Sequence, residues 1–465
     1  MSKEQTHTEL SRGLTSAQIS MIGLAGALGT GLFLGSGATI AQGGPATIIS
    51  YALAGAMALG VVWALAEMVV AHPAPGGYGA VAAKYWGPFG GYITRWNFAV
   101  VMLVAVGAEV TATATYLQYW FPGLPLFAGT IFASLLIVSL NLITVKLYGV
   151  SEYWFSMIKV VAISVFILFG FSVIFRGTAS SPPTGFSNLW DHGGFAPNGL
   201  FGVAAATALA VFSFGGIENV SVAAAESTNP SKDVPRAARN MIWRLLVFYV
   251  AAMVVVLALE PWTKTAASDG TLLTSPFVRV LALVGVSGGA DIMNGVLIVA
   301  ALSAANGCLY ASSRMIHSLA LDGFAPRCAA RTASNGSPRV AVTFAASGMA
   351  LAAALSLISP DGAFMILYGG ATAGILVTWS TVMWTHLLFQ RGLAAAGEER
   401  PASRLWFAPV VNWVILAGVA AIFVILYFVL PIVWWAGIPY VAVLTSSYFI
   451  VARHKRSTAE RRLDG

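Results

Sequence analysis

Three ionisable residues stand inside long apolar stretches of this chain: Glu109, Lys159 and Glu218. A charged group at membrane depth costs about 2.5–3.5 kcal/mol or more unless it is protonated or paired. Burial disfavours the charged form of such groups, so they can bind and release protons. We interpret all three as candidates for proton coupling. The alternatives for Glu109 are a helix-to-helix hydrogen bond or contact with a cationic substrate. The alternative for Lys159 is a permanently charged contact between helices.

Glycine interrupts two of the apolar stretches near their midpoints. The first break runs from Gly26 to Gly31, and the second from Phe212 to Gly216. Glycine inside a helix costs about 0.8–1 kcal/mol relative to alanine. In a membrane, the N–H and C=O groups that a break frees are tolerated only where they line a cavity. Paired broken helices in two halves of a chain predict a substrate site near the bilayer midplane.

Composition places the chain among membrane proteins. Its 465 residues are 58% hydrophobic and 9% charged, whereas soluble domains carry about 25% charged residues. Apolar runs of about 18 residues or more can cross roughly 30 Å of hydrocarbon. We predict spans at 18–40, 45–70, 92–119, 124–145, 150–175, 199–225, 241–260, 289–313, 339–359, 362–388, 407–429 and 431–451.

The distribution of basic residues indicates how the chain is oriented in the membrane, because lysine and arginine accumulate in cytoplasmic loops. With the N-terminus inside, all but four of the 25 basic residues lie on the inner side. The exceptions are Arg176, Lys264 and Arg279 on the outer side and Lys159 within the membrane. The net charge of +7 is thus a topology signal, and a nucleic-acid partner is not expected.

Two cysteines are predicted at or beyond the inner end of helix 8. Cys308 and Cys328 would face a reducing compartment there, so a structural disulfide is not expected.

Motifs along the whole chain carry a family resemblance. They are Gly26–Gly37, Ala66–Met68, Lys84–Pro88, Tyr119–Pro122, Phe155–Val160, Phe212–Glu218, Ala225–Ser227 and Ser313–Met315. In this order they resemble the amino acid transporter family of the amino acid–polyamine–organocation superfamily. Its members include bacterial permeases for aromatic amino acids, phenylalanine, proline, D-serine and γ-aminobutyrate.

The resemblance implies an all-α membrane fold of the leucine-transporter type, a five-plus-five inverted repeat with broken helices 1 and 6. The first repeat would cover 18–175 and the second 199–388, followed by two helices at 407–451. The tails, 1–17 and 452–465, would be cytoplasmic, in a bacterial inner membrane. Family members import amino acids together with protons. The resemblance implies no cofactor or metal, and a monomer or weak oligomer among membrane lipids.

The first break suits a zwitterion. No arginine lies deep in a predicted span to pair a substrate carboxylate, so backbone groups must bind it. Free N–H groups at Gly29, Thr30 and Gly31 would hold the carboxylate. Carbonyl groups from Ile22 to Ala25 would face the ammonium. Close packing of small residues between helices is the alternative explanation of these glycines.

The resemblance also assigns roles at the second break and in the pocket. Phe214 would be an aromatic gate over the substrate, and Glu218 lies one helical turn beyond it. A lysine at the position of Lys159 would put its ammonium between helices 1 and 8. The remaining pocket residues would be Met102, Ser213, Gly215, Ala304, Ala305 and Tyr368.

Two polar residues near inner helix ends have structural interpretations. For Glu67 we favour hydrogen bonding that stabilises the fold over a role in gating. For His386 we favour an interfacial position over a proton relay.

The pocket residues are mostly apolar or small, which favours a neutral, apolar or aromatic L-amino acid. The sequence therefore predicts a secondary active importer that works by proton symport with alternating access. An amino acid exchanger, a permease for proline, D-serine or γ-aminobutyrate, and a non-transporting sensor remain alternatives. An enzyme is not expected, because the chain has no metal-spaced cluster and no serine in a nucleophile elbow.

Overall fold

The computed structural model describes residues 16–142, 145–178, 182–227, 229–266, 275–285, 287–333 and 336–463. Helices make up its regular secondary structure. Most of the predicted N-terminal tail lies outside the described residues.

Nineteen α-helices and five short 3-10 helices follow one another along this part of the chain. The α-helices are α1 Ser16–Ala27, α2 Thr30–Phe33, α3 Gly35–Gly43, α4 Thr47–Ala71, α5 Tyr78–Tyr85, α6 Gly87–Gln118, α7 Leu126–Asn141, α8 Val145–Arg176, α9 Gly199–Ala210, α10 Asn219–Ala223, α11 Pro230–Leu259, α12 Trp262–Ala266, α13 Pro276–Leu283, α14 Gly289–Leu321, α15 Arg339–Ala345, α16 Ser347–Ile358, α17 Ala363–Ala396, α18 Val410–Val429 and α19 Ile432–Leu463. The 3-10 helices are η1 Gly44–Ala46, η2 Ser187–Leu189, η3 Val211–Phe214, η4 Ala224–Glu226 and η5 Arg327–Ala330.

Ten helical runs among the described residues are long and apolar enough to cross a membrane. They match ten of the predicted spans. The other two, 18–40 and 124–145, fall on the broken segment α1–α3 and on α7, whose 16 residues are short for a crossing. The apolar, multi-pass membrane character is confirmed, while the number of twelve crossings stays a prediction.

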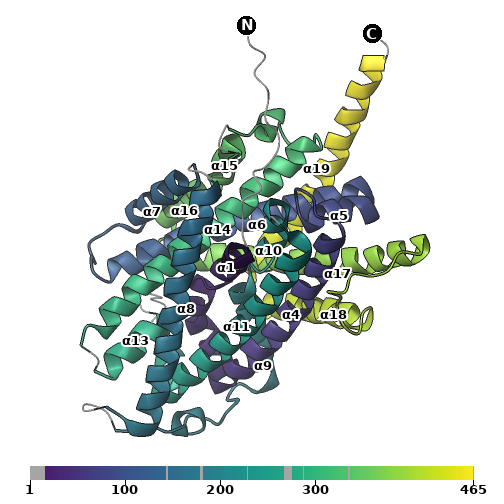
Figure 1. Cartoon of the computed structure of the whole chain (residues 1–465). Helices are drawn as coiled ribbons and strands as arrows, with labels where there is room; N and C mark the ends of the chain where they lie inside the picture. The colour runs from purple at the N-terminus through teal and green to yellow at the C-terminus, as the bar shows by residue number, and fades with distance from the viewer. Residues whose placement is uncertain are drawn as a thin grey trace.

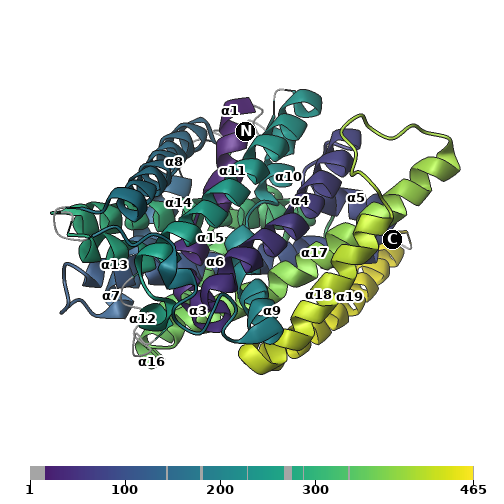
Figure 2. The same ribbon diagram turned by 90° about the horizontal axis from the view of Figure 1, so that it is seen from below.

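Helices α6, α14 and α17 form the buried centre of the bundle. Helix α6 packs against both of the others, and α1 lies beside α14 and α11 (Figure 1). Helices α18 and α19 lie side by side along one edge (Figure 2). These two are also the least buried of the ten long runs, as expected for helices whose outer faces contact lipid.

The two glycine-rich segments are both broken, and their breaks contact each other. Helix α1 ends at Ala27, and Gly29 is extended, with φ −120° and ψ −156°. In the second segment, Gly216 has φ +95°. A Cβ atom on Gly216 would lie 2.6 Å from the carbonyl carbon and oxygen of Gly26. Both the positive φ and the close backbone approach therefore require glycine at position 216.

This contact generates a stability prediction. Gly216→Ala introduces a methyl group against backbone that cannot rotate away, in a conformation that costs a non-glycine residue about 1–3 kcal/mol. We expect a melting temperature several degrees lower for the detergent-purified protein. Gly123→Ala is the matched control, because a Cβ atom there meets nothing within 4 Å. Equal melting temperatures for the two variants would contradict the proposed tight contact.

Candidate functional site

A small cavity lies where the two breaks meet. Its volume is about 10 Å³, which is about the space that one water molecule needs. It is lined by Gly26, Ala27, Gly29, Gly31, Met102, Ala105, Glu109, Phe212, Gly215, Cys308 and Ile375. The structure thus has a closed site that no organic ligand can occupy without movement of its walls.

Several of the predicted site residues surround this cavity. Gly29, Gly31, Met102, Gly215 and Glu109 line it directly. Ala304 lies behind Gly29, since a Cβ atom on that glycine would come 2.9 Å from the Ala304 Cβ.

The residues predicted to face an ammonium group precede the break. Ile22 is fully buried in α1. Ala25 belongs to the same helix, but its side chain lies outside the described part of the structure. The assignment of their carbonyl groups to a substrate stays a prediction.

Glu109 holds the backbone at the first break. The N–H of Thr30 donates to its carboxylate, 3.2 Å from Oε1 and 3.3 Å from Oε2. Glu109 comes from α6 and is 4% exposed. A donor that the break frees is therefore satisfied by an acidic side chain from a different helix.

Glu218 accepts from a backbone N–H at the second break, within its own segment. Its Oε2 accepts from the N–H of Gly216 at 2.9 Å, and its Oε1 accepts from the indole Nε1–H of Trp379 at 2.6 Å. Both Glu218 and Trp379 are fully buried. No motif in the sequence singles out Trp379, because only the packing of α17 brings its ring to this carboxylate.

The hydroxyl of Tyr249 in α11 lies within hydrogen-bond distance of one carbonyl group at each break. Its hydroxyl lies 2.6 Å from the carbonyl oxygen of Ala27 and 2.7 Å from that of Ser213, so it can donate to either. The hydroxyl of Ser213 lies 3.2 Å from that of Tyr51. Sequence reasoning missed both tyrosines, which stand in apolar stretches without a motif.

The two phenylalanines of η3 face different directions. Phe212 lines the cavity and packs on Tyr368, with ring centroids 4.3 Å apart. Phe214, the predicted gate, packs away from the cavity against Tyr249, with centroids 4.9 Å apart. Residues two apart in a 3-10 helix, which has three residues per turn, cannot share a face. The gating role of Phe214 therefore stays a prediction for another arrangement of this segment.

Lys159 lies on the face of α8 that contacts α1. It is fully buried and interacts electrostatically with Glu152, Glu109 and Cys308. One turn before it, the hydroxyl of Ser156 donates to the carbonyl of Met21 in α1 at 3.0 Å.

Glu152 shares that face of α8, and sequence reasoning did not include it in the site. It is fully buried, and its carboxylate accepts from the Ser303 hydroxyl at 2.6 Å and from the Asn306 amide at 3.0 Å. Its spacing of seven residues from Lys159 was the available signal, because positions i, i+4 and i+7 of a helix lie on one face. Among the described residues, no group of His, Cys, Asp and Glu side chains could hold a metal ion.

Cys308 is not at the inner end of its helix, so that prediction was wrong. Helix α14 continues to Leu321, about two turns beyond the predicted end at 313. Cys308 consequently lies well inside the helix and lines the cavity.

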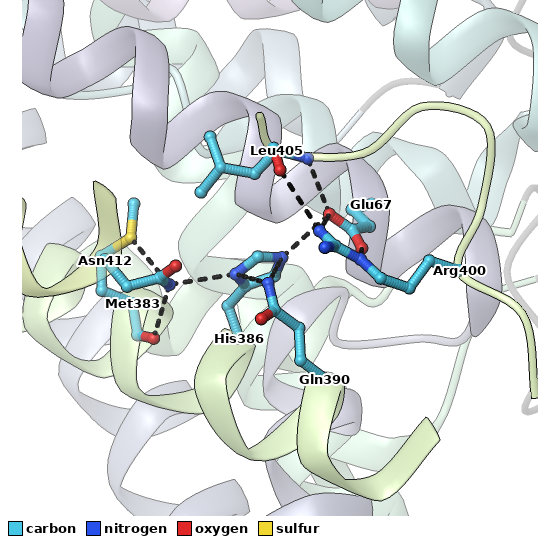
Figure 3. A network of polar contacts seen from close by, with 7 residues as sticks. All are labelled: Glu67, Met383, His386, Gln390, Arg400, Leu405 and Asn412. Atoms are coloured by element: carbon cyan, nitrogen blue, oxygen red, sulfur yellow. Dashed lines mark hydrogen bonds and ion pairs between the residues drawn. The ribbon is translucent and has the colours of Figure 1, made fainter. Parts of the chain in front are cut away.

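A second polar cluster ties α4 to α17 and to the segment that follows α17 (Figure 3). Glu67 accepts from Arg400, with Nε 2.7 Å from Oε1 and Nη2 2.9 Å from Oε2. It also accepts from the N–H of Leu405 at 2.7 Å. The predicted hydrogen-bonding role of Glu67 in the fold is confirmed.

His386 belongs to this cluster. Its Nε2 lies 3.0 Å from Oε2 of Glu67, and its Nδ1 lies 3.0 Å from the Asn412 amide nitrogen (Figure 3). The ring is fully buried among these partners, and α17 continues to Ala396, almost three turns beyond this histidine. The interfacial position of His386 stays a prediction.

Comparison with known proteins covers nearly the whole chain. Residues 18–456 match the family model described as amino acid permease. The aromatic amino acid transport protein AroP of Escherichia coli is 37% identical over 426 residues, which is 92% of each protein. The γ-aminobutyric acid permease of Bacillus subtilis is 34% identical over 425 residues, covering 91% of this chain and 90% of that protein.

The Glu67 cluster generates a double-variant prediction. Arg400→Met leaves the buried Glu67 carboxylate with less compensation, so the melting temperature should fall. Breaking a fully buried ion pair typically lowers the free energy of unfolding by about 3–5 kcal/mol. We expect a smaller loss here, because the Arg400 side chain is 27% exposed. Adding Glu67→Gln should restore part of the loss, since the uncompensated charge is then gone.

Arg404→Met, an exposed position in the same segment, serves as the control and should change little. If the double variant is less stable than the sum of the two single losses, the pair does not compensate charge as described.

Proposed function

The chain belongs to the amino acid permease family, and from this premise we propose that it imports a neutral, apolar or aromatic L-amino acid by proton symport with alternating access. As a member of that family it is an amino acid transporter of the membrane and not an enzyme. The observation that carries the proposal is the meeting of two broken helices at a closed cavity. Buried acidic side chains hold the free N–H groups at that point.

The lining of the cavity supports the substrate class. Met102, Ala105, Phe212 and Ile375 give it apolar walls, and Glu109 is the one charged residue among the residues that line it. The name of one relative refers to aromatic amino acids and that of another to γ-aminobutyric acid. Proline, D-serine and γ-aminobutyrate remain the alternative substrates.

A zwitterion would bind across the first break. The N–H groups of Gly29, Thr30 and Gly31 hold its carboxylate, and the carbonyls of Ile22 and Ala25 face its ammonium. In the closed structure the Gly29 N–H donates to the Ala27 carbonyl at 2.9 Å, so it must release that bond first. The walls must separate for this to happen, because about 10 Å³ does not admit an amino acid. The opened pocket then also exposes Ser213, Phe214, Gly215, Ala304 and Tyr368 to the side chain.

We assign proton coupling to Lys159, Glu109 and Glu218. All three residues are almost fully buried: Lys159 and Glu218 are 0% exposed, and Glu109 is 4% exposed. Lys159 interacts electrostatically with Glu109, so a change of charge on either residue alters the other. Such a pair can link a proton to the state of the first break.

The membrane arrangement is part of the same proposal. Twelve helices cross the inner membrane of a bacterium with both termini in the cytoplasm. Two inverted repeats, 18–175 and 199–388, precede helices at 407–451. The cluster of Arg279 with Glu260 and the carbonyl of Lys264, at 2.7 Å and 3.1 Å, lies on the outer side in this arrangement. The protein acts as a monomer or weak oligomer.

The substrate class can be tested by thermal unfolding with a panel of amino acids. A ligand that binds only the folded state raises its stability by RT ln(1 + [L]/Kd). We expect L-phenylalanine, L-tyrosine and L-tryptophan at millimolar concentration to raise the melting temperature more than proline, D-serine or γ-aminobutyrate. A larger shift with γ-aminobutyrate would contradict the preference for aromatic substrates.

The coupling role of Lys159 can be tested in proteoliposomes. Wild type should accumulate substrate when an inward proton gradient is imposed and little without it. Lys159→Ala should still bind substrate but lose the accumulation. Lys232→Ala, which removes an exposed lysine, is the control.

Unchanged accumulation by the Lys159 variant would remove this residue from the coupling mechanism. The alternatives give other results in the same vesicles. An exchanger would show counterflow that ignores the pH gradient, and a sensor would bind substrate without counterflow.

A further inference from the structure

We infer that the Glu109 carboxylate and the substrate carboxylate compete for the N–H of Thr30, so that substrate binds only when Glu109 gives up this contact and takes a proton. The inference rests on the proposed function, which places the substrate carboxylate at the same break. To that function it adds the group that competes with the substrate carboxylate, Glu109, and the order in which proton and substrate bind.

The competition follows from where the Glu109 carboxylate lies. Both of its oxygens are within 3.3 Å of the Thr30 nitrogen. A Cβ atom on Gly29 would come 2.5 Å from Oε1 of Glu109, so the carboxylate also covers the preceding residue of the break. Glu109 and Gly29 both line the cavity. An acidic side chain therefore occupies the position that a substrate carboxylate needs.

The site cannot hold two ionised carboxylates. Its volume of about 10 Å³ leaves no room for a second one. Like charges that share one donor also repel, so one carboxylate must be protonated or displaced. The substrate carboxylate stays ionised if Glu109 is the group that accepts the proton and swings away.

The groups around Glu109 fit this exchange. Those that interact with it electrostatically are Lys159 of α8, Cys308 of α14, Tyr249 of α11 and Tyr116 of its own helix. Of these, Lys159 is the one basic side chain, and it interacts with the buried Glu152 carboxylate as well as with Glu109.

Charge and atoms balance in the sequence of steps. A proton from the outer medium forms an O–H bond on Glu109, and the ionised carboxylate of the substrate takes the Thr30 N–H. The Thr30 N–H keeps one ionised carboxylate as its acceptor throughout. The loaded site carries one more positive charge than the empty site, which is the charge of the bound proton. After the site opens inward, the substrate leaves, the Glu109 O–H bond breaks, and its proton passes to water on the inner side.

Asn219 gives independent support for a polar ligand at this point. It is fully buried, and neither polar atom of its amide has a hydrogen-bond partner within the described part of the chain. Its Nδ2 lies 2.5 Å from the position that a Cβ atom on Gly26 would take, and Gly26 lines the cavity. Buried polar groups in proteins are nearly always paired, so this amide is a second candidate contact for a zwitterion.

The competition can be tested without knowledge of the substrate. Glu109→Ala removes the internal carboxylate and leaves the Thr30 N–H without its acceptor, so added acetate should bind in its place. We expect acetate to raise the melting temperature of Glu109→Ala in a concentration-dependent way and to leave wild type unchanged. Acetamide, which is neutral and of similar size, should have no such effect.

Met102→Ala is the matched control, because it enlarges the same cavity from the same helix and keeps Glu109 in place. It should not respond to acetate. The inference is overturned if Glu109→Ala fails to respond, or if all three proteins respond equally.

Glu109→Gln provides a second test if the alanine variant does not fold. When one proton binds with each substrate molecule, affinity changes by about tenfold per pH unit. The Kd of wild type for L-phenylalanine should therefore fall as pH is lowered, and that of Glu109→Gln should not vary. Equal pH dependence in the two proteins would overturn the inference. A wild type that does not bind L-phenylalanine would instead contradict the proposed substrate class. The amino acid that raises the melting temperature of wild type most would then replace L-phenylalanine in this comparison, and its pH dependence would decide the inference.

Discussion

The main-chain groups that two helix breaks release inside the membrane need partners, and the rest of the site is arranged around this need. A buried donor or acceptor without a partner costs about 1–3 kcal/mol, and at bilayer depth no lipid can supply one. Here the Thr30 N–H donates to Glu109 and the Gly216 N–H donates to Glu218. The carbonyls of Ala27 and Ser213 share the hydroxyl of Tyr249. The first break is thus completed by side chains from other helices, Glu109 of α6 and Tyr249 of α11. The second break uses Glu218 of its own segment together with Tyr249.

This solution has a functional consequence, because the partners at the N–H groups are acids. A neutral amide could satisfy the same donors, but it would not respond to protons. Glu109 also interacts electrostatically with Lys159 of α8, and in the proposed mechanism this interaction links the charge on α8 to the first break. The proposed mechanism therefore needs no long pathway between the proton site and the substrate site, because both use the hydrogen bond to the Thr30 N–H.

Buried charges elsewhere in the bundle are paired differently. Glu67 faces Arg400, His386 and the Leu405 N–H together, so its charge is offset by several donors at once (Figure 3). Glu109 has a single backbone donor by comparison, and its two oxygens lie at the long end of hydrogen-bond distances. A contact of this kind is easier to exchange for a ligand, whereas the Glu67 cluster fixes the position of α4 against α17.

The sequence by itself determined that the chain lies in a membrane, where its helices break and that Glu109, Lys159 and Glu218 are buried, because composition, glycine position and hydropathy are local properties. It also identified the family, through motifs that occur in order along the chain. Only the tertiary structure decided which side chains meet. Phe212 lines the cavity while Phe214 does not, Cys308 and His386 lie deeper in their helices than predicted, and Tyr249 and Trp379 complete the breaks. These outcomes depend on where each helix ends, on its rotation about its own axis and on contacts between residues tens to hundreds of positions apart, which no local pattern specifies.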